Sequence, residues 1–284
     1  MADPEQFNAD QLAFWNGPGG HTWVARQEHT DVTLAPVSDA LLALAAPRAG
    51  ERVLDIGCGC GATTLELARA VGPAGRVAAL DISAPMLAEG QSRAEAAGIA
   101  NVDWLQADAA TAALDGFDLL ASHFGVMFFG DPVAAFAHMR RAASPGARMA
   151  FVCWRPITEN PWMEVPLHAI YRHVPRRPKP DPQAPGMFAF ADPQRAFQVL
   201  TAAGWAPPRL DKLDLDLDIA AGRGLEEAVD QSTQIGAVSS ALRGQPAEAV
   251  AAAIVSIREA LAAHLNGASV RLPGAMWLVS SAPA

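Results

Sequence analysis

The sequence predicts an α/β fold in which a mostly parallel sheet carries helices on both faces. Short β-rich runs alternate with helical stretches from about residue 52 to about residue 154, which is typical of strands joined by crossover helices. Turns rich in glycine and proline separate these segments. Three alternate glycines, Gly57, Gly59 and Gly61, directly follow the first strand. Since ligands bind outside the carboxyl ends of strands in open α/β sheets, we expect a ligand-binding turn there.

The expected elements of this core follow one another in regular order. Gly72 and Pro73 end the first helix, and Pro85 lies in the first turn of the second. The expected strands are 52–56, 76–82, 102–106, 117–122 and 147–154, the last after a turn at 144–146. The expected helices are 62–71, 85–97 and 132–143.

The segments around the core predict a lid and insertions. Residues 1–46 are expected to form an N-terminal helical lid of two or three helices, broken by a flexible turn at 16–20. Residues 47–284 are expected to form one domain with insertions at about 155–191 and 220–245, the first proline-rich and irregular. Further helices are expected at 193–203, 224–243 and 246–265, a strand whose leucines at 213, 215 and 217 alternate with water-facing acids, and a last strand at 276–280.

Length and composition indicate a globular protein. The 284 residues suffice for one large α/β domain with insertions, or for such a domain with a small companion. Hydrophobic residues make up 51% of the chain and charged residues 18%, which argues against disorder. The apolar stretches are too short to span a bilayer, and the polar, acidic start at 1–10 is unlike a signal peptide. We therefore expect no membrane partner.

Charge and cysteine content restrict the partners and the compartment. A net charge of −9 argues against nucleic acid as the main partner, because phosphate backbones require clustered lysine and arginine. Cys58 and Cys60 are too close for an ordinary disulfide framework, and Cys153 is remote in sequence, which favours a reducing cytoplasm. Because Cys58 and Cys60 lack a second cysteine or histidine pair, we expect no metal site.

The glycine turn and the acid before it favour a cationic ligand. Closely spaced glycines let the backbone approach a ligand and adopt positive φ. The spacing differs from the GxGxxG of dinucleotide enzymes, because Gly61 comes two residues after Gly59. Asp55 would repel a pyrophosphate at this place and would suit a positively charged ligand. A cap of the loop or helix is the alternative role for Asp55.

Two further acids follow the second and third strands. Asp81 ends the second strand, where a carboxylate can accept hydrogen bonds from both ribose hydroxyls, or else cap the following helix. Asp108 can accept from the exocyclic amine of adenine while Ala109 offers its backbone N–H, or else be an ordinary loop acid. Since the strand ends meet at one edge, Asp55, Asp81 and Asp108 are expected to converge on one crevice.

Together these segments resemble the class I S-adenosylmethionine-dependent methyltransferases, most closely their ubiquinone/menaquinone-methyltransferase-like branch. The resemblance covers about residues 50–155 and is carried by VLDIGCGCG, ALDIS followed by PML, LQADA, FDLLASHFGVMFF and RRAASPGARMAFVCW. It implies a Rossmann-like methyltransferase sheet with strand order 3-2-1-4-5-7-6 and strand seven antiparallel. Cys60 departs from the pattern, because many members have a small or polar residue there.

The resemblance also implies S-adenosyl-L-methionine as the cofactor and assigns residues to its parts. Asp55 and the three glycines would surround the methionine part, Asp81 the ribose, and Asp108 with Ala109 the adenine. The remaining implied contacts are Ile82 and Met86 beside the adenosine, with Ser122 and His123 by the methionine and the reacting methyl.

Catalysis and acceptor binding leave several candidates. Methyl transfer is an in-line displacement that chiefly needs alignment, with a general base only where the nucleophile must lose a proton. His123 is the foremost candidate base, ahead of His21 and Tyr171, although a structural hydrogen bond is the alternative for His123. Flat or apolar acceptors would suit the aromatic residues expected near the site, which could equally pack a core: Trp15, Trp23, Phe124, Phe128, Trp154 and Trp162.

A basic cluster lies in the first insertion. It could meet an anionic substrate or form a solvated loop face, and consists of Arg172, His173, Arg176, Arg177 and Lys179. The sequence therefore predicts methyl transfer from S-adenosyl-L-methionine to a small-molecule acceptor. An NAD-type oxidoreductase and a catalytically idle S-adenosylmethionine-binding protein are the alternatives.

Overall fold

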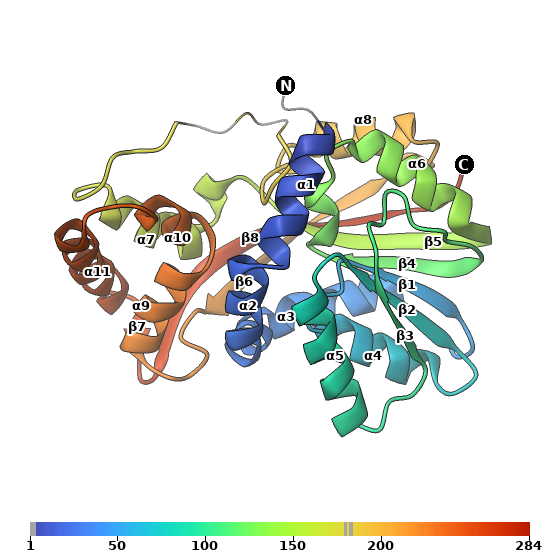
Figure 1. Ribbon diagram of the computed structural model, residues 1–284, viewed down its shortest axis with the longest axis horizontal. Helices are drawn as coiled ribbons and strands as arrows, with labels where there is room; N and C mark the ends of the chain where they lie inside the picture. Colours follow the sequence, from blue (N-terminus) through green and yellow to red (C-terminus); the bar gives the residue numbers. More distant parts are fainter. Residues whose placement is uncertain (1–3, 179–180, 182–183) are drawn as a thin grey trace.

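The computed structural model describes residues 4–178, 181 and 184–284 and contains one mixed sheet (Figure 1). In this part of the chain the sheet has eight strands. They are β1 (Arg52–Ile56), β2 (Arg76–Asp81), β3 (Val102–Gln106), β4 (Phe117–His123), β5 (Ala143–Trp154), β6 (Arg209–Asp218), β7 (Leu265–Asn266) and β8 (Ser269–Ser281).

The strand order is β3-β2-β1-β4-β5-β8-β6, with β7 paired to β8 outside this path. Strands β1 to β5 are parallel, and β8 runs antiparallel to both β5 and β6. The predicted order 3-2-1-4-5-7-6 is thereby confirmed, with β8 in the place of the antiparallel strand seven. The carboxyl ends of β1, β2, β3 and β4 consequently meet along one edge.

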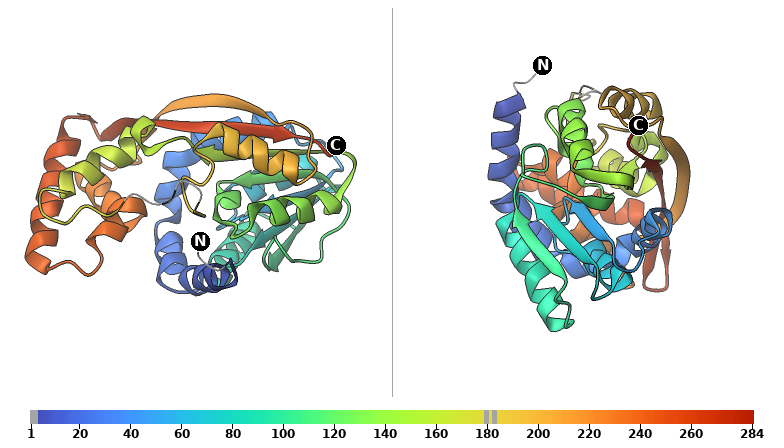
Figure 2. Two further views of the ribbon diagram at one scale, coloured as in Figure 1. Left: turned by 90° about the horizontal axis from the view of Figure 1, so that it is seen from above. Right: turned by 90° about the vertical axis from the view of Figure 1, so that its right-hand side faces the viewer.

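Helices cover both faces of the sheet (Figure 2). The α-helices are α1 (Pro4–Trp15), α2 (Pro18–Ala25), α3 (Gln27–Ala45), α4 (Ala62–Val71), α5 (Ala84–Ala96), α6 (Pro132–Ala142), α7 (Pro161–Ile170), α8 (Pro193–Ala202), α9 (Leu225–Gln234), α10 (Gly236–Leu242) and α11 (Ala247–Ala262). Two short 3₁₀ helices are η1 (Gly125–Phe128) and η2 (Ile157–Glu159). Among the described residues, no helix is both long and apolar enough to cross a bilayer.

Aromatic packing fixes α6 on the sheet. The Phe136 ring of α6 is fully buried and lies 5.7 Å from the Phe151 ring of β5 and 6.0 Å from the Phe190 ring. The Trp205 indole N–H donates to the Phe136 carbonyl at 2.9 Å, so the segment after α8 is tied to the same place. Burial of such rings supplies much of the free energy that holds helix layers to a sheet.

Four helices lie away from strands β1 to β5 and form, with the short strand β7, what we call the cap: α7, α9, α10 and α11. Figure 1 shows the cap at the end of the molecule away from β1 to β5, with α1 and α2 between the two parts. The long strands β6 and β8 extend from the sheet to the cap (Figures 1 and 2). The N-terminal helices, the sheet and the cap therefore surround a common space.

The two segments expected to be irregular contain helices. Pro18, Gly19 and Gly20 belong to α2 instead of a flexible turn, with Pro18 in the first turn, where its missing N–H is tolerated. A Cβ on Gly20 would lie 2.0 Å from the Trp15 carbonyl oxygen, so glycine is needed there for close packing. The expected irregular insertion at 155–191 contains α7, whose Met163, Leu167 and Ile170 are buried. Their burial outweighs the proline content.

The last two long strands begin earlier than expected, because each pairs beyond the sheet core. Register pairs join β6 to β8 continuously from Arg209 with Ser280 to Asp218 with Arg271. Of the acids of β6 expected to face water, Asp214 is exposed although it also forms an ion pair, whereas the expectation was wrong for Asp218. Asp214 pairs with Arg155, and the Asp218 carboxylate accepts backbone N–H groups of Ala220, Gly222 and Val270 at 3.0 to 3.1 Å.

Candidate functional site

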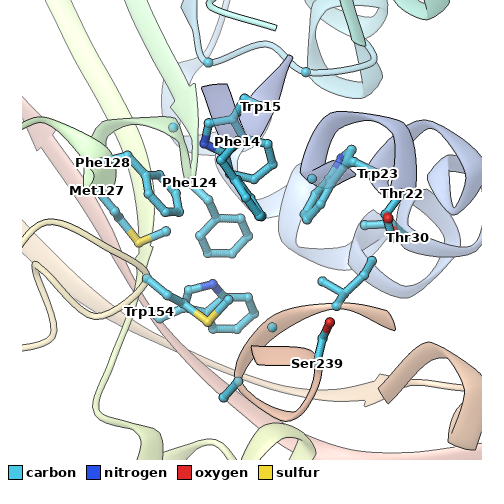
Figure 3. A pocket seen from close by; sticks show the side chains of 18 of the residues that line it. Phe14, Trp15, Thr22, Trp23, Thr30, Phe124, Met127, Phe128, Trp154 and Ser239 are labelled. Atoms are coloured by element: carbon cyan, nitrogen blue, oxygen red, sulfur yellow. The ribbon is translucent and has the colours of Figure 1, made fainter. Parts of the chain in front are cut away.

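A cavity of about 1540 Å³ lies at the carboxyl ends of the parallel strands. Its walls come from the sheet edge, from α1 to α3 and from the cap, and Figure 3 shows side chains of all three parts facing it. Pockets for one small ligand usually measure roughly 300 to 1,000 Å³. The cavity is therefore large enough for a cofactor and a second molecule together.

Glycine is needed at the three positions of the turn after β1 for different physical reasons. All have positive φ, +67° at Gly57, +55° at Gly59 and +81° at Gly61. A Cβ on Gly57 would lie 2.7 Å from the Gly125 Cα, and one on Gly61 would lie 2.7 Å from the Trp104 ring. Gly57 and Gly59 line the cavity, whereas Gly61 does not and packs against protein.

Asp55 lies beneath the glycine turn and does not line the cavity. Its Oδ2 accepts hydrogen bonds from the hydroxyls of Thr64 at 2.6 Å and Thr63 at 3.1 Å, in the first turn of α4. Burial raises the pKa of Asp55 to about 6. The expected direct place beside a ligand is thus not what the structure shows, because the carboxylate instead fastens the loop to α4, as in the capping alternative.

Asp81 lies at the edge of the cavity and connects two loops. Its Oδ2 accepts the Gly59 backbone N–H at 2.9 Å and its Oδ1 accepts the Ser83 N–H at 2.9 Å. Burial raises the pKa of Asp81 above its ordinary value, against the lowering effect of these hydrogen bonds. Each carboxylate oxygen has more than one lone pair, so both can accept a further hydrogen bond from a ligand.

The other residues expected around an adenosine lie along the same wall. Ile82, Met86, Asp108 and Ala109 all line the cavity. Asp108 also accepts the Ala110 N–H at 2.8 Å, which turns the chain after β3. The end of β2 and the end of β3 therefore contribute neighbouring acids to one crevice, as the sequence predicts.

Ser122 and His123, at the end of β4, have different surroundings. Ser122 is 1% exposed and does not line the cavity, contrary to its expected place by the methyl group. Its hydroxyl donates to the Ile56 carbonyl at 2.7 Å and so joins β4 to β1. His123 lines the cavity, and burial lowers its pKa to about 4, so its imidazole is neutral at neutral pH. Its Nε2 lies 3.5 Å from the Ser38 hydroxyl.

A stack of aromatic rings forms one wall of the cavity. Phe124 and Trp154 are stacked with centroids 4.4 Å apart and planes at 7°, and Trp162 lies 5.0 Å from Trp154 (Figure 3 shows the first pair). Phe124 has φ +68°, a conformation that costs a bulky residue about 1 to 3 kcal/mol. The surrounding contacts thus hold the ring against Trp154 despite local strain.

The N-terminal helices supply the facing aromatic rings. Trp15 lies edge-on to Trp23 at 6.1 Å and to Phe128 at 5.9 Å, and all three line the cavity. In Figure 3, Trp15 and Phe14 lie above Phe124, on the side of the view opposite Trp154. All six aromatic residues expected near the site therefore line one cavity.

Of the weaker candidates for a general base or for substrate binding, some line the cavity and others do not. Tyr171 lines the cavity, whereas His21 does not. Within the expected basic cluster, Arg176 and Arg177 line the cavity and Arg172 and His173 do not. Lys179 lies outside the described residues.

Sequence reasoning missed several residues that shape the site. Asn16 lies in the turn between α1 and α2, where its Nδ2 donates to the Ile82 carbonyl at 2.9 Å and its Oδ1 accepts the Ala84 N–H at 2.9 Å. Arg93 donates to the Cys60 carbonyl at 2.5 Å and pairs with Asp31 of α3 at 2.6 Å. No local signal marks such residues, because their partners are remote in sequence.

The neutral state of His123 has a measurable consequence for stability. As pH falls below 6.5, the ordinary pKa, the unfolded chain takes up a proton at His123 and the folded chain does not until about pH 4. From about pH 7.5 to about pH 5, wild type should lose about 2 kcal/mol of unfolding free energy relative to His123→Gln. Urea unfolding of both proteins measures this.

Asp55 does not disturb this comparison. Its raised pKa of about 6 changes stability in the opposite direction over the same pH range, but equally in both proteins. Parallel pH dependence of wild type and His123→Gln would contradict a neutral His123 with a lowered pKa.

Comparison with known proteins shows which family this chain resembles. Residues 38–176 match the model of the ubiE/COQ5 methyltransferase family. The chain is 36% identical over 118 residues to aklanonic acid methyltransferase DauC of Streptomyces sp. strain C5, covering 41% of this chain and 54% of that protein. It is 34% identical over 114 residues to the ubiquinone/menaquinone biosynthesis C-methyltransferase UbiE of a Ruegeria species, covering 39% and 45%. The chain thus matches about half the length of these relatives.

A solved structure agrees over most of the chain. The YcgJ protein of Bacillus subtilis superposes with a TM-score of 0.55 at 20% identity, covering 86% of this chain and 96% of that one, which shows a common fold. The strand order, the glycine turn between β1 and α4 and the sequence match agree with one another. These findings together support a class I S-adenosylmethionine-dependent methyltransferase of the ubiE/COQ5-like branch, by the match of residues 38–176.

Proposed function

We propose that the protein transfers a methyl group from S-adenosyl-L-methionine to a small-molecule acceptor and releases S-adenosylhomocysteine. The observation that carries this proposal is the position of Asp81, whose carboxylate holds the glycine turn and lines the cavity at once. The family of the sequence relatives supports the same reaction.

The residues at the sheet edge fit this cofactor. A Cβ on Gly59 would lie 3.0 Å from Met86 Cε, so the bare glycine backbone keeps this part of the wall open. The cofactor carries two positive charges and one negative charge, and a net positive ligand is favoured beside Asp81 and Asp108. In this proposal the cofactor-binding residues are Gly57, Gly59, Asp81, Ile82, Met86, Asp108 and Ala109, while Asp55, Gly61 and Ser122 position the loops.

The chain contributes alignment and exclusion of water. When bound, S-adenosyl-L-methionine supplies a methyl group activated by its positively charged sulfur. The aromatic walls hold an acceptor in one orientation and keep water from the reacting atoms, which is the main source of rate in such displacements. His123, neutral at neutral pH, can take a proton from an acceptor that must lose one. A lower kcat of His123→Gln with unchanged cofactor affinity would support this role.

The acceptor proposed here is flat and largely apolar. Support comes from the Phe124–Trp154 stack and from Trp162 on one side, with Trp15 and Trp23 on the other. Parallel ring stacking and edge-on contacts both favour planar ligands. We further propose a cytoplasmic location, since Cys58, Cys60 and Cys153 are all buried free thiols, and cell fractionation tests it.

Within segment 1–46, expected to be a lid on a domain formed by 47–284, we propose that only α1 and α2 act as the lid, because Val37, Leu41 and Ala45 of α3 are buried in the core. Its turn between α1 and α2 is fastened by Asn16 to the loop after β2, and the Ser83 hydroxyl donates to the Trp15 carbonyl at 2.6 Å. These polar contacts of α1 and α2 can separate and form again while α3 stays in place. They join the lid directly to the loop that bears Asp81.

The proposed function is tested by calorimetry with S-adenosylmethionine, S-adenosylhomocysteine and NAD, followed by a turnover screen of metabolite extracts with methyl-labelled cofactor. Binding of NAD alone would indicate an oxidoreductase. Binding of the first two without any labelled product would indicate a catalytically idle binding protein.

Asp81→Ala should weaken S-adenosylhomocysteine binding at least tenfold, or about 1.4 kcal/mol, because acceptors for the ribose hydroxyls are lost. Asp81→Asn retains one acceptor oxygen and should fall between this variant and wild type. The matched control Asp115→Ala removes an exposed loop acid that does not line the cavity. An unchanged calorimetric affinity of Asp81→Ala for S-adenosylhomocysteine would contradict the assignment of Asp81 to the ribose.

Hydrogen exchange tests the lid. S-adenosylhomocysteine should slow the exchange of residues 12–25, and Asn16→Ala should reverse much of this protection because it removes the hydrogen bonds to Ile82 and Ala84. Helix α11, remote from these contacts, is the internal reference. Equal and strong protection of 12–25 with and without ligand would mean that α1 and α2 are a fixed wall.

A further inference from the structure

The charged side chains that line the cavity are separated by sign. The sheet edge and the N-terminal helices contribute Asp81, Asp108 and Asp31, the last paired with Arg93. The arginines that line the cavity come from the chain after α7 and after α10, and are Arg176, Arg177 and Arg243. One acid, Glu164 of α7, lies on the same side as the arginines.

Among the described residues, one ring contact or hydrogen bond holds each of these arginines. The Arg176 guanidinium lies 5.2 Å from the Tyr171 ring centroid, and that of Arg243 lies 5.9 Å from the Phe14 ring. Arg177 donates to the Ser240 carbonyl near the end of α10. A guanidinium has five N–H groups, so each side chain keeps donors for a ligand.

No carboxylate of the described residues lies within ion-pair distance of Arg176, Arg177 or Arg243. Glu164 instead lies 3.9 Å from the His168 ring. The chain has 30 acidic residues against 21 lysines and arginines. With acids in excess, most arginines would be expected to have a carboxylate partner, so three arginines at the same cavity without one among the described residues are notable.

We propose that Arg176, Arg177 and Arg243 bind an anionic group, carboxylate or phosphate, of the methyl acceptor. This rests on the proposed function and narrows its substrate class to flat, aromatic anions. The ring system lies against Phe124 and Trp154, and its charged end reaches the arginines at the rim. The two ends of the cavity thereby match two ligands of opposite charge, a cationic cofactor at the acids and an anionic acceptor at the arginines.

The physical reason is the geometry of the guanidinium group. Its fork of donors forms paired hydrogen bonds with carboxylate and phosphate oxygens, and such charge-assisted bonds are stronger than neutral ones. The three arginines are exposed, so water screens each interaction and the effect of any single one is modest. Their joint effect, and their steering of an anion into the cavity, is larger.

The test measures binding of three matched probes to protein saturated with S-adenosylhomocysteine: 2-naphthoate, 2-naphthyl phosphate and the neutral 2-naphthamide. Tryptophan fluorescence reports binding, because Trp154 and Trp162 line the cavity. At least one anion should bind about fivefold or more tightly than the amide, and the stronger of the two identifies the anionic group. The preference should fall with added salt.

Variants of the arginines test which side chains cause the preference for the anionic probes. Arg243→Gln should reduce the preference about two- to threefold, and the triple variant with Arg176→Gln and Arg177→Gln should abolish it. Arg172→Gln, which removes an equal charge from the same segment outside the cavity, should keep it. Melting curves check that the triple variant is folded.

The outcomes separate this inference from the proposed function. The inference is overturned if the amide binds as tightly as both anions, if no probe binds, or if the preference survives in the triple variant. Failure of the same proteins to bind S-adenosylhomocysteine overturns the proposed function instead. The probes are then measured on protein without cofactor, where the arginines alone decide the result.

Discussion

The antiparallel pairing of β6 with β8 is the constraint on which the site depends. The two strands stay in register over ten residue pairs, from the sheet core to the cap, and their backbone hydrogen bonds set where the cap helices lie. Asn160, fully buried before α7, adds a second tie, since its side chain exchanges hydrogen bonds with the Ala275 N–H and carbonyl of β8. Without this extension the carboxyl edge of the sheet would open to solvent, with no opposite wall to enclose an acceptor.

At the carboxyl ends of β1 and β2, close backbone contacts largely set the shape of the loop that lines the cavity. The turn after β1 passes so close to Gly125 that no Cβ fits on Gly57, and the Gly57 N–H bonds to the Leu80 carbonyl at 2.8 Å. Asp81 continues this pattern by accepting the Gly59 N–H. A loop held from two sides in this way keeps its shape before any ligand arrives, which lowers the entropy lost on binding.

The sheet half was largely predictable because its signals are local. Strands β1 and β3 and helix α4 have their expected bounds, since alternating apolar runs and glycine stops mark them directly. Asp55 and Ser122 were misplaced for the opposite reason: their partners, Thr63 with Thr64 and Ile56, decide which way each side chain points. Arg243 and Phe14 are more than two hundred residues apart, so no sequence period brings them together.

The manner in which α9, α10, α11 and β7 of the cap are attached has a further consequence. Asp218 and Arg271 are register partners on adjacent strands, so residues 219–270 leave and re-enter the sheet about 5 Å apart, as the loop of a hairpin does. The Asp218 carboxylate closes this junction by accepting N–H groups from both of its ends. Loop length adds little to the free energy of closing such a junction. Exchange of this segment for another of different length is therefore compatible with the same sheet, which makes it a natural grafting site for a chimera with altered acceptor preference.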